Sequence, residues 1–391
     1  MQLLPTKKYL RAPHSGSVMA TGHKVQESIR ILIEGESSRP NHSKQSNVMI
    51  CMVPDSLRKL NPDAYTPQIT SIGPLHKEDG QTSFTNYEDS KLDEMMVIDG
   101  CFILELLYRF KYGIGEGDPI FDNILVTRDI QNDLLLLENQ IPFFILEILF
   151  SLTVKEVLKH VVLTDSLTDL VFYFIKDMNI MNGRELTMTD EKVEHCHILG
   201  FFQSCYRPRG TQRGPIPTIS YSATEIAGAG VRFKAQRDEN SLLAVKFKHS
   251  FFVPGLVSLC VRDTCFKIPV LSIKNSTPSL LRNLIAYEQC YPLSRHYITS
   301  FAFLMDRLID TKDDVSLLVR SKVLQHNLGA SEDVTSLFNN ICNGVVLRDF
   351  YYTDEWRKLD EYCNQFWPSI LISLRCLYRS TTWKTLTVLP Q

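Results

Sequence analysis

The sequence predicts a mainly α-helical protein with a small antiparallel β insertion, that is, an α+β chain whose body is a helical bundle. Apolar residues recur at the helical period in both halves of the 391-residue chain. Between them, Val245-Lys-Phe-Lys-His249 alternates apolar and polar side chains, which is typical of a strand. Because 44% of the residues are hydrophobic, the chain has enough apolar surface for a sizeable core.

The pattern divides the chain into four parts. Residues 1–47 are rich in Ser, His, Lys, Gly and Pro and are expected to form a mobile tail. An N-terminal helical lobe follows at 48–209, then a loop with a small antiparallel sheet at 210–276, then a C-terminal helical lobe at 277–391. We expect 48–391 to form one body of two interleaved lobes.

The first strong helix is predicted over Glu94–Phe110, where apolar residues occupy most of the circumference. Glu94, Glu105 and Arg109 fall on one narrow polar stripe. Gly100 lacks a Cβ and weakens a helix, so a close crossing by another element is its expected reason. The segment therefore predicts a central helix that is covered on several sides.

The stretch from Asn132 to Phe150 is apolar except for a polar cluster next to a proline. Pro142 lacks an N–H and would clash with the carbonyl of Glu138, so we expect one helix to end near Asn139 and another to begin at Pro142. The side-chain amides of Asn139 and Gln140 are then placed to satisfy the backbone groups that the break frees.

Further elements are expected along the chain. Helical pattern continues over 154–178, and strands are predicted over 231–233, 245–249, 256–261 and 266–273, with a turn at Arg262-Asp263. Thr277-Pro278 is a helix-start signal, and the helices predicted after it cover 279–291, 297–309, 315–328 and 331–351. The strands predict an antiparallel sheet, and the last third predicts a helical bundle.

No cofactor or metal is predicted. His195-Cys196-His197 with Cys205 does not match zinc spacing, because adjacent helical residues point about 100° apart, and a partly buried helical face explains it better. Ala227-Gly-Ala-Gly230 precedes a strand, whereas a phosphate loop follows one, so loop flexibility is the better interpretation.

Carboxylates within apolar sequence raise the question of catalysis. Such residues are Asp99, Glu105, Glu138 and Glu147, and no nucleophile or pocket partner accompanies them in the sequence. Hydrogen bonding to backbone at helix breaks is the favoured role, and no catalytic residue is predicted. The alternative is a hydrolase or transferase with a carboxylate pocket at Glu138 or Asp99.

Ten cysteines are scattered among apolar residues, which favours free thiols in a reducing compartment; a disulfide between Cys260 and Cys265 is the lesser alternative. No secretory h-region is present at the N-terminus, and no apolar run reaches the roughly 18–20 residues of a membrane span. We expect a cytoplasmic protein that is not secreted. Peripheral contact with the plasma membrane, as a scaffold held through 366–389, is a further alternative.

Five motifs in order resemble a plant family, the domain of unknown function 247. They are Tyr65-Thr-Pro-Gln-Ile-Thr-Ser-Ile-Gly-Pro-Leu-His76, Met96-Val-Ile-Asp-Gly-Cys-Phe-Ile-Leu-Glu-Leu106, Asp133-Leu-Leu-Leu-Leu-Glu-Asn-Gln-Ile-Pro-Phe-Phe144, Ser222-Ala-Thr-Glu225 with Ala229-Gly-Val-Arg-Phe233, and Leu281-Arg-Asn-Leu-Ile-Ala-Tyr-Glu-Gln-Cys-Tyr291. The motif residues expected to have structural roles are Asp99, Gly100, Glu105, Glu138, Asn139, Gln140, Pro142 and Glu288.

The resemblance implies a land-plant protein with no established catalytic activity, and for some grass members it implies a part in pollen self-incompatibility. Family members usually carry a C-terminal membrane anchor and a longer helical stretch between His76 and Met95, and both are expected to be missing here. A shortened isoform, a divergent paralogue or an imperfect gene model would explain both differences.

The function expected from the sequence is therefore a non-enzymatic interaction or recognition module. Its partner would be an unknown protein, and not nucleic acid, because 42 basic and 44 acidic residues are intermixed and leave a net charge of −2. Candidate contact residues in the central loop are Tyr206, Arg207, Arg209 and Arg213.

Overall fold

The computed structural model describes nine stretches of the chain, which divide into two compact units. The described residues are 50–76, 89–114, 117–153, 165–188, 195–208, 214–237, 241–249, 264–291 and 295–364. Unit 1 takes its described residues from Met1–Asn179, Leu186–Cys205 and Ser279–Pro292, and unit 2 takes them from Ile180–Glu185, Tyr206–Pro278 and Leu293–Gln391. Twelve α-helices and five short strands lie in these stretches, so the mainly helical prediction with a small β part is confirmed.

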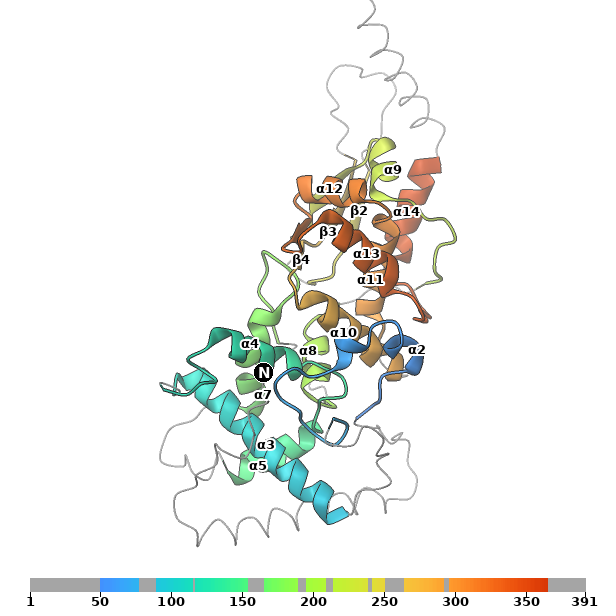
Figure 1. Ribbon diagram of the computed structural model, residues 1–391. Helices are drawn as coiled ribbons and strands as arrows, with labels where there is room; N and C mark the ends of the chain where they lie inside the picture. Colours follow the sequence, from blue (N-terminus) through green and yellow to red (C-terminus); the bar gives the residue numbers. More distant parts are fainter. Residues whose placement is uncertain are drawn as a thin grey trace, which may run out of the picture. The chain divides into compact units, whose positions relative to one another are not determined.

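Unit 1 is built on the long helix α3 (Asp89–Tyr112), which packs against α5 (Phe143–Leu152) and α7 (Leu167–Ile175) (Figure 1). The crossing of α3 and α5 depends on Gly100, because a Cβ at this position would lie 2.3 Å from Cδ1 of Leu149. The prediction that Gly100 permits a close crossing is confirmed.

Six further helices belong wholly or largely to unit 1. They are α2 (Asp55–Arg58), the 3-10 helix η2 (Pro62–Tyr65), α4 (Ile124–Asp133), the 3-10 helix η4 (Lys176–Met178), α8 (Ile198–Ser204) and α10 (Thr277–Cys290), which is part of unit 1 from Ser279 on.

The break before Pro142 exists, but the first helix ends earlier than predicted. Helix α4 stops at Asp133, and residues 134–141 form turns until α5 begins at Phe143 with Pro142 as its N-cap. The prediction of a helix that ends near Asn139 is therefore wrong. The cause is competition for backbone carbonyls, since the side-chain amides of Asn139 and Gln140 donate to carbonyls in the turn that the amides of a continued helix would use.

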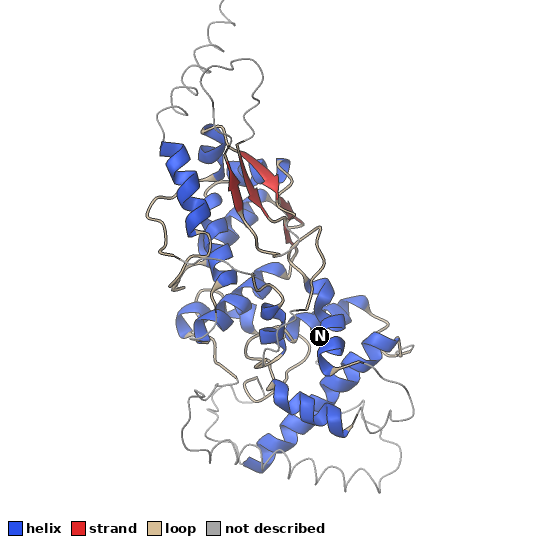
Figure 2. Ribbon diagram, turned by 180° about the vertical axis from the view of Figure 1, so that it is seen from behind, coloured by secondary structure: helices blue, strands red, loops and turns tan. Residues whose placement is uncertain are grey.

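Unit 2 combines helices with two small sheets (Figure 2). Its helices are α9 (Ala223–Gly228), α11 (Tyr297–Leu308), α12 (Lys312–Arg320), α13 (Ser331–Ile341) and α14 (Thr353–Asn364). Its strands are β1 (Arg232–Ala235), β2 (Lys246–Lys248), β3 (Cys265–Ile268), β4 (Leu271–Ile273) and β5 (Leu324–His326).

One sheet is mixed and the other is parallel, which corrects the prediction of an antiparallel insertion. The three-stranded sheet has the order β1-β3-β2, in which β1 pairs in parallel with β3 and β2 pairs antiparallel with it. Phe233, Phe247 and Phe266 share one register row, and the ring of Phe266 on the central strand contacts the rings of the other two. A separate parallel pair joins β4 and β5.

The C-terminal helices are shorter than their predicted ranges. The helix predicted over 315–328 ends at Arg320, because Lys322 adopts a left-handed φ of 59° and the chain then enters β5. The helix predicted over 331–351 ends at Ile341, and α14 was not predicted.

Several predicted features fall outside the described residues: the tail at 1–47, the strand at 256–261 with its turn, most of the segment between His76 and Met95, and the stretch 366–389. Among the helices that the structure does describe, none has the length and apolar character needed to cross a bilayer.

Candidate functional site

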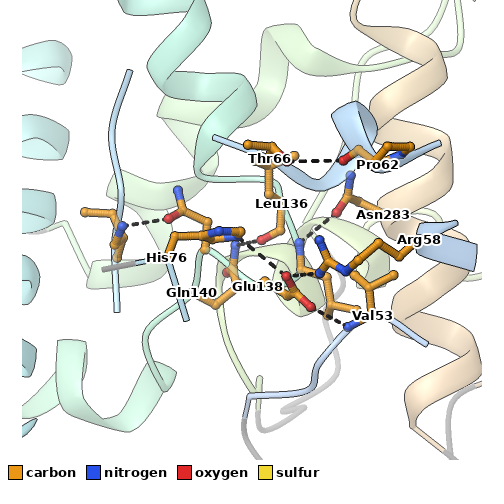
Figure 3. Close-up of polar contacts among 12 residues, drawn as sticks. Val53, Arg58, Pro62, Thr66, His76, Leu136, Glu138, Gln140 and Asn283 are labelled. Atoms are coloured by element: carbon orange, nitrogen blue, oxygen red, sulfur yellow. Dashed lines mark hydrogen bonds and ion pairs between the residues drawn. The ribbon is translucent and has the colours of Figure 1, made fainter. Parts of the chain in front are cut away.

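A buried carboxylate, Glu138, lies at the centre of a polar cluster in unit 1 (Figure 3). Only 4% of Glu138 is exposed. Its Oε1 accepts a hydrogen bond of 2.7 Å from the amide of Val53, and its Oε2 accepts one from the guanidinium of Arg58 and pairs with it. The Nε2 atom of His76 lies 3.6 Å from the same Oε2.

The local fold brings these groups together from three parts of the sequence. Glu138 lies in the turn between α4 and α5. Val53 and Arg58 come from α2 and the residues just before it, and His76 comes from the segment that follows η2. The turn is fixed to α10 by Asn283, whose Oδ1 accepts a 2.8 Å hydrogen bond from the amide of Leu137. Its Nδ2 donates a hydrogen bond of 2.7 Å to the carbonyl of Ala64 in η2.

Asn139 closes the same turn and is fully buried. Its Nδ2 donates to the carbonyls of Thr70 and Asp133, both at 2.9 Å, and its Oδ1 accepts from the amide of Ile72 at 2.6 Å. The prediction that this amide satisfies freed backbone groups is confirmed.

Gln140 has the same role on the other side of the turn. Its Nε2 donates to the carbonyls of Leu134 and Leu136, at 2.8 and 2.7 Å. Its Oε1 accepts from the amide of Leu199, the second residue of α8, at 3.2 Å. One side chain therefore holds both the end of α4 and the start of α8.

Two aspartates hold the extended segment 68–73. Asp133 accepts from the amides of Gln68, Ile69 and Thr70 at 2.8–2.9 Å. Burial raises the pKa of Asp133, and the three amides oppose this shift. Asp99 on α3 accepts a hydrogen bond of 2.9 Å from the amide of Gly73. Asp99 is bonded to a backbone amide, as the favoured interpretation of the sequence expected, whereas Asp133 was not among the carboxylates that the sequence pointed to.

His76 is the least satisfied member of the cluster. Burial lowers its pKa, and this effect exceeds the opposite influence of Glu138, so the ring is neutral at pH 7. Its buried Nε2 has no hydrogen-bond partner within the described residues, because the 3.6 Å to Glu138 is too long for a hydrogen bond. The sequence analysis did not single out His76 as a site residue.

The remaining motif residues have separate positions. Glu105 is exposed on α3 and lies 3.6 Å from Arg109 of the next turn. Glu288 on α10 is fully buried and accepts a hydrogen bond of 2.8 Å from Nε2 of Gln203 on α8. Pro142 caps α5 as described above.

The predicted contact loop is only partly described. Tyr206 is fully buried, and its hydroxyl accepts 3.1 Å from the amide of Ile180 in unit 2, which corrects the expectation that this ring faces a partner. Arg207 is half-buried. Arg209 and Arg213 lie outside the described residues.

A surface that the sequence analysis missed lies where α3 leads into α4. Ile124 and Leu125 open α4 with 82% and 70% of their surface exposed, and Tyr112 and Ile114 at the end of α3 are 40% and 50% exposed. We call these four residues the apolar corner. The only sequence signal for it was Asn123, whose side chain caps α4 and so places the next two residues in the open first turn.

Arg109 fixes the backbone of this corner. Its Nε donates 2.9 Å to the carbonyl of Ile114, and its Nη1 pairs with Asp118 at 2.8 Å. The guanidinium also lies over the ring of Phe121, 5.5 Å from its centre. Three contacts from one rigid fork hold the connection between the two helices.

The His-Cys-His segment is part of the core of unit 1. The ring of His197 is fully buried and caps α8, with Nδ1 accepting 3.1 Å from the amide of Gly200. His195 contacts the rings of Phe143 and Phe201. The described residues hold no group of three or more His, Cys, Asp or Glu arranged to bind a metal ion.

Comparison with known proteins decides the family. A family model described as "Plant protein of unknown function", DUF247, matches residues 50–93 and 81–390. The chain belongs to DUF247. The two matched stretches of the DUF247 model overlap between His76 and Met95, where the sequence predicted a shortened segment.

Two curated relatives of this DUF247 chain come from Arabidopsis thaliana. UPF0481 protein At3g47200 is 24% identical over 86% of this chain and 82% of its own length. A second UPF0481 protein, At3g02645, is 25% identical over 44% of this chain and 30% of its own length. No solved structure matches the DUF247 chain.

Proposed function

We propose that this plant protein is a non-enzymatic protein-interaction module that binds a protein partner through the apolar corner. The observation that carries this proposal is the exposure of Ile124 and Leu125, two adjacent aliphatic residues at 82% and 70%. Neighbouring large apolar side chains that are exposed together mark protein–protein interaction sites, whereas single exposed ones are common on any surface.

Rigidity supports the same proposal. Arg109 holds the connection between α3 and α4 through two hydrogen-bonded groups and a ring contact. A surface whose backbone is already ordered loses less conformational entropy on binding. Recognition between cells, which the family resemblance implies for pollen of some grasses, is one form that such binding takes.

The environment of the carboxylates also favours binding over catalysis. Both oxygens of Glu138 are engaged, one by the amide of Val53 and one by Arg58. Asp133 and Asp99 are likewise bonded to backbone amides. A general acid or base must reach a substrate atom, and these carboxylates are turned toward their own chain.

The test is a paired affinity purification of the full chain from plant extracts, with quantitative mass spectrometry. The variant I124D/L125D is compared with wild type and with V346D, which places one aspartate on a residue 65% exposed in unit 2. The proposal expects a protein that wild type and V346D retain and that I124D/L125D loses at least tenfold. Equal retention by all three would contradict it, once circular dichroism confirms that the variants fold.

A second candidate is acid–base chemistry at Glu138 and His76. One observation favours it, the buried Nε2 of His76 that faces Glu138 Oε2 at 3.6 Å without a hydrogen-bond partner in the described part of the chain. A hydrolase or transferase of this kind would lose activity in both H76Q and E138Q. A screen of esters, amides and glycosides that finds turnover by wild type and none by these variants would support the enzyme.

A further inference from the structure

Cationic residues recur in every strand of the three-stranded sheet of unit 2 (Figure 2). The strands read Arg-Phe-Lys-Ala in β1, Lys-Phe-Lys in β2 and Cys-Phe-Lys-Ile in β3. These three strands, as the structure describes them, contain no Asp or Glu. Their cations come from three separate segments of the chain, so only the pairing of the strands shows how they lie relative to one another.

The pairing places three lysines in one row. Lys267 on the central strand β3 is the register partner of Lys234 on β1 and of Lys246 on β2. Residues that pair directly across strands project to the same face of a sheet. Neighbouring strands lie about 4.8 Å apart, so the row spans about 10 Å between its outer Cα positions.

A second row on the same face adds two cations. Cys265 pairs with Arg232 on β1 and with Lys248 on β2, and it comes two residues before Lys267. Residues two apart on a strand share a face and lie about 7 Å apart, so the cations form a patch of about 10 by 7 Å. We call this patch the lysine face, and its members are Arg232, Lys234, Lys246, Lys248 and Lys267.

The burial of the strands follows this alternation. Arg232 and the two lysines of β2 are exposed, and the other two members of the lysine face are half-buried. The phenylalanine row is buried on the opposite face, where the ring of Phe247 contacts Tyr362 on α14. The amide of Phe247 donates a hydrogen bond of 2.5 Å to Oε2 of Glu355 on the same helix. The lysine face therefore lies on a backbone that packing holds in place.

The arrangement of like charges has an energetic consequence. Cationic side chains directly opposite each other on adjacent strands repel, and this repulsion opposes the pairing of the strands. An anion with several negative groups, bound over the first row, would offset the repulsion between Lys267 and its two neighbours. Because such an anion would bind the folded sheet and not the unfolded chain, it should also stabilise the fold.

We propose that the lysine face binds a small polyphosphorylated anion that is free in solution, of the inositol polyphosphate class. Several phosphates around one small ring can each meet a cation of a compact patch at the same time. Phosphate is favoured over carboxylate because four of the five cations are lysines, which bind phosphate as point charges, whereas carboxylates suit the planar fork of arginine. The site is in unit 2 and does not rest on the apolar corner.

Two larger anionic partners fit this face less well. A single-stranded nucleic acid stacks its bases on exposed aromatic rings, and the aromatic residues of these strands are on the buried face. Membrane binding scales with buried apolar area as well as with charge, and the three strands as described expose no large apolar side chain. Both observations favour a compact, soluble anion.

The first experiment titrates the full chain with inositol hexakisphosphate by isothermal calorimetry, at an ionic strength of about 0.15 M. The first row is removed in K234Q/K246Q/K267Q. The matched control removes the same number of charges from exposed lysines outside the sheet, in K59Q/K312Q/K322Q. We expect the row variant to bind about tenfold more weakly than wild type or worse, and the control to bind within about twofold of wild type. Equal affinities of the two variants would overturn the proposal.

Thermal unfolding separates a loss of binding from a loss of folding. Without ligand, the row variant should have a Tm no lower than that of wild type, because the substitutions remove repulsion. Inositol hexakisphosphate should raise the Tm of wild type and of K234R/K246R/K267R, which keeps the three charges. The second row supplies an independent variant, R232Q/K248Q, whose affinity should also fall. An equal rise in Tm for wild type and for both glutamine variants would overturn the proposal.

Competition distinguishes the source of the phosphate groups. Inositol hexakisphosphate is compared with vesicles that contain phosphatidylinositol bisphosphate and with a single-stranded oligonucleotide, at equal concentrations of accessible phosphate. Wild type is expected to prefer the soluble ring, and this preference should be lost in K234Q/K246Q/K267Q. Tighter binding of wild type to the vesicles or to the oligonucleotide would overturn the proposal and assign the lysine face to a membrane or to a nucleic acid.

Discussion

The side-chain amide of Asn139 hydrogen-bonds to the backbone on either side of Ser71, at Ile72 and Thr70, as a neighbouring β-strand would. Its Oδ1 accepts the Ile72 amide at 2.6 Å, while its Nδ2 donates to the carbonyl of Thr70 at 2.9 Å. Asn139 also reaches the carbonyl of Asp133 at the end of α4. One buried amide therefore joins the extended segment, the turn and the helix end.

Replacement of Asn139 by alanine is expected to destabilise unit 1 strongly. N139A takes the partner from two buried backbone groups, the amide of Ile72 and the carbonyl of Thr70, while the carbonyl of Asp133 keeps the amide of Leu136. We expect a loss of about 3 kcal/mol in the free energy of unfolding. Hydrogen exchange at the Ile72 amide measures this loss. N340A, which removes an exposed asparagine from α13, should change stability by less than about 0.5 kcal/mol. Similar small effects from both variants would contradict the structural role of Asn139.

Alanine substitutions at Gly73 and Gly113 distinguish the cost of a left-handed backbone from the cost of a steric clash, because the two glycines have nearly the same φ but different surroundings. Gly73 has φ of 69° and Gly113 has φ of 66°, but a Cβ on Gly73 would lie 2.5 Å from the carbonyl oxygen of Gln140, whereas none on Gly113 meets an atom within 4 Å. G113A should cost about 1 kcal/mol from the left-handed conformation alone. G73A should lower the free energy of unfolding by at least twice as much, which thermal unfolding of both variants measures. Equal losses would show that the segment moves freely away from the turn.

Acid should weaken unit 1 through His197. Burial lowers the pKa of this fully buried ring to about 3 from a normal value of 6.5, so it stays neutral in the folded protein while the unfolded chain takes up a proton. The contribution of neutral His197 to the free energy of unfolding is therefore fully present above about pH 6.5. It falls as the pH drops toward 3, by up to about 1.4 kcal/mol per pH unit.

H197N isolates this effect, because asparagine caps a helix without titrating. The free energy of unfolding, measured with urea between pH 4 and 7, should fall more steeply with decreasing pH for wild type than for H197N. The other histidines with lowered pKa, His76 and His195, are present in both proteins and cancel in the difference. Parallel profiles would mean that His197 becomes protonated without unfolding.

Arg109 should control the apolar corner without being part of it. R109K keeps the charge but loses the fork that reaches both Ile114 and Asp118, so we expect faster hydrogen exchange over 113–123. If the corner binds a partner, the affinity should fall several-fold through lost rigidity. Unchanged exchange in R109K would show that other contacts order this connection.

The sequence predicted well those features that depend on local chemistry. The long helix α3, the crossing at Gly100 and the closing role of the amides beside Pro142 follow from periodicity, side-chain size and the missing proline N–H. These effects act within a few residues or on one helix face.

Features that depend on distant partners were not predictable from the sequence. The parallel pairing of β1 with β3 brings together residues 33 positions apart, as in Arg232 and Cys265, and hydrophobic alternation does not encode strand direction. The contact between Leu137 and Asn283 spans 146 residues. The burial of Tyr206 and the exposure of Leu125 likewise depend on which elements pack over each side chain.

The most direct measurement for the proposed function is site-specific photo-crosslinking in plant tissue. A photoreactive phenylalanine analogue replaces Leu125 in the full chain, and the same analogue at Val346 serves as the control on unit 2. We predict one protein crosslinked at position 125 and lost when Ile124→Asp is added, with no such product at 346. The same products at both positions, or none at 125 from tissue that expresses the protein, would contradict the claim that the apolar corner is an interaction surface.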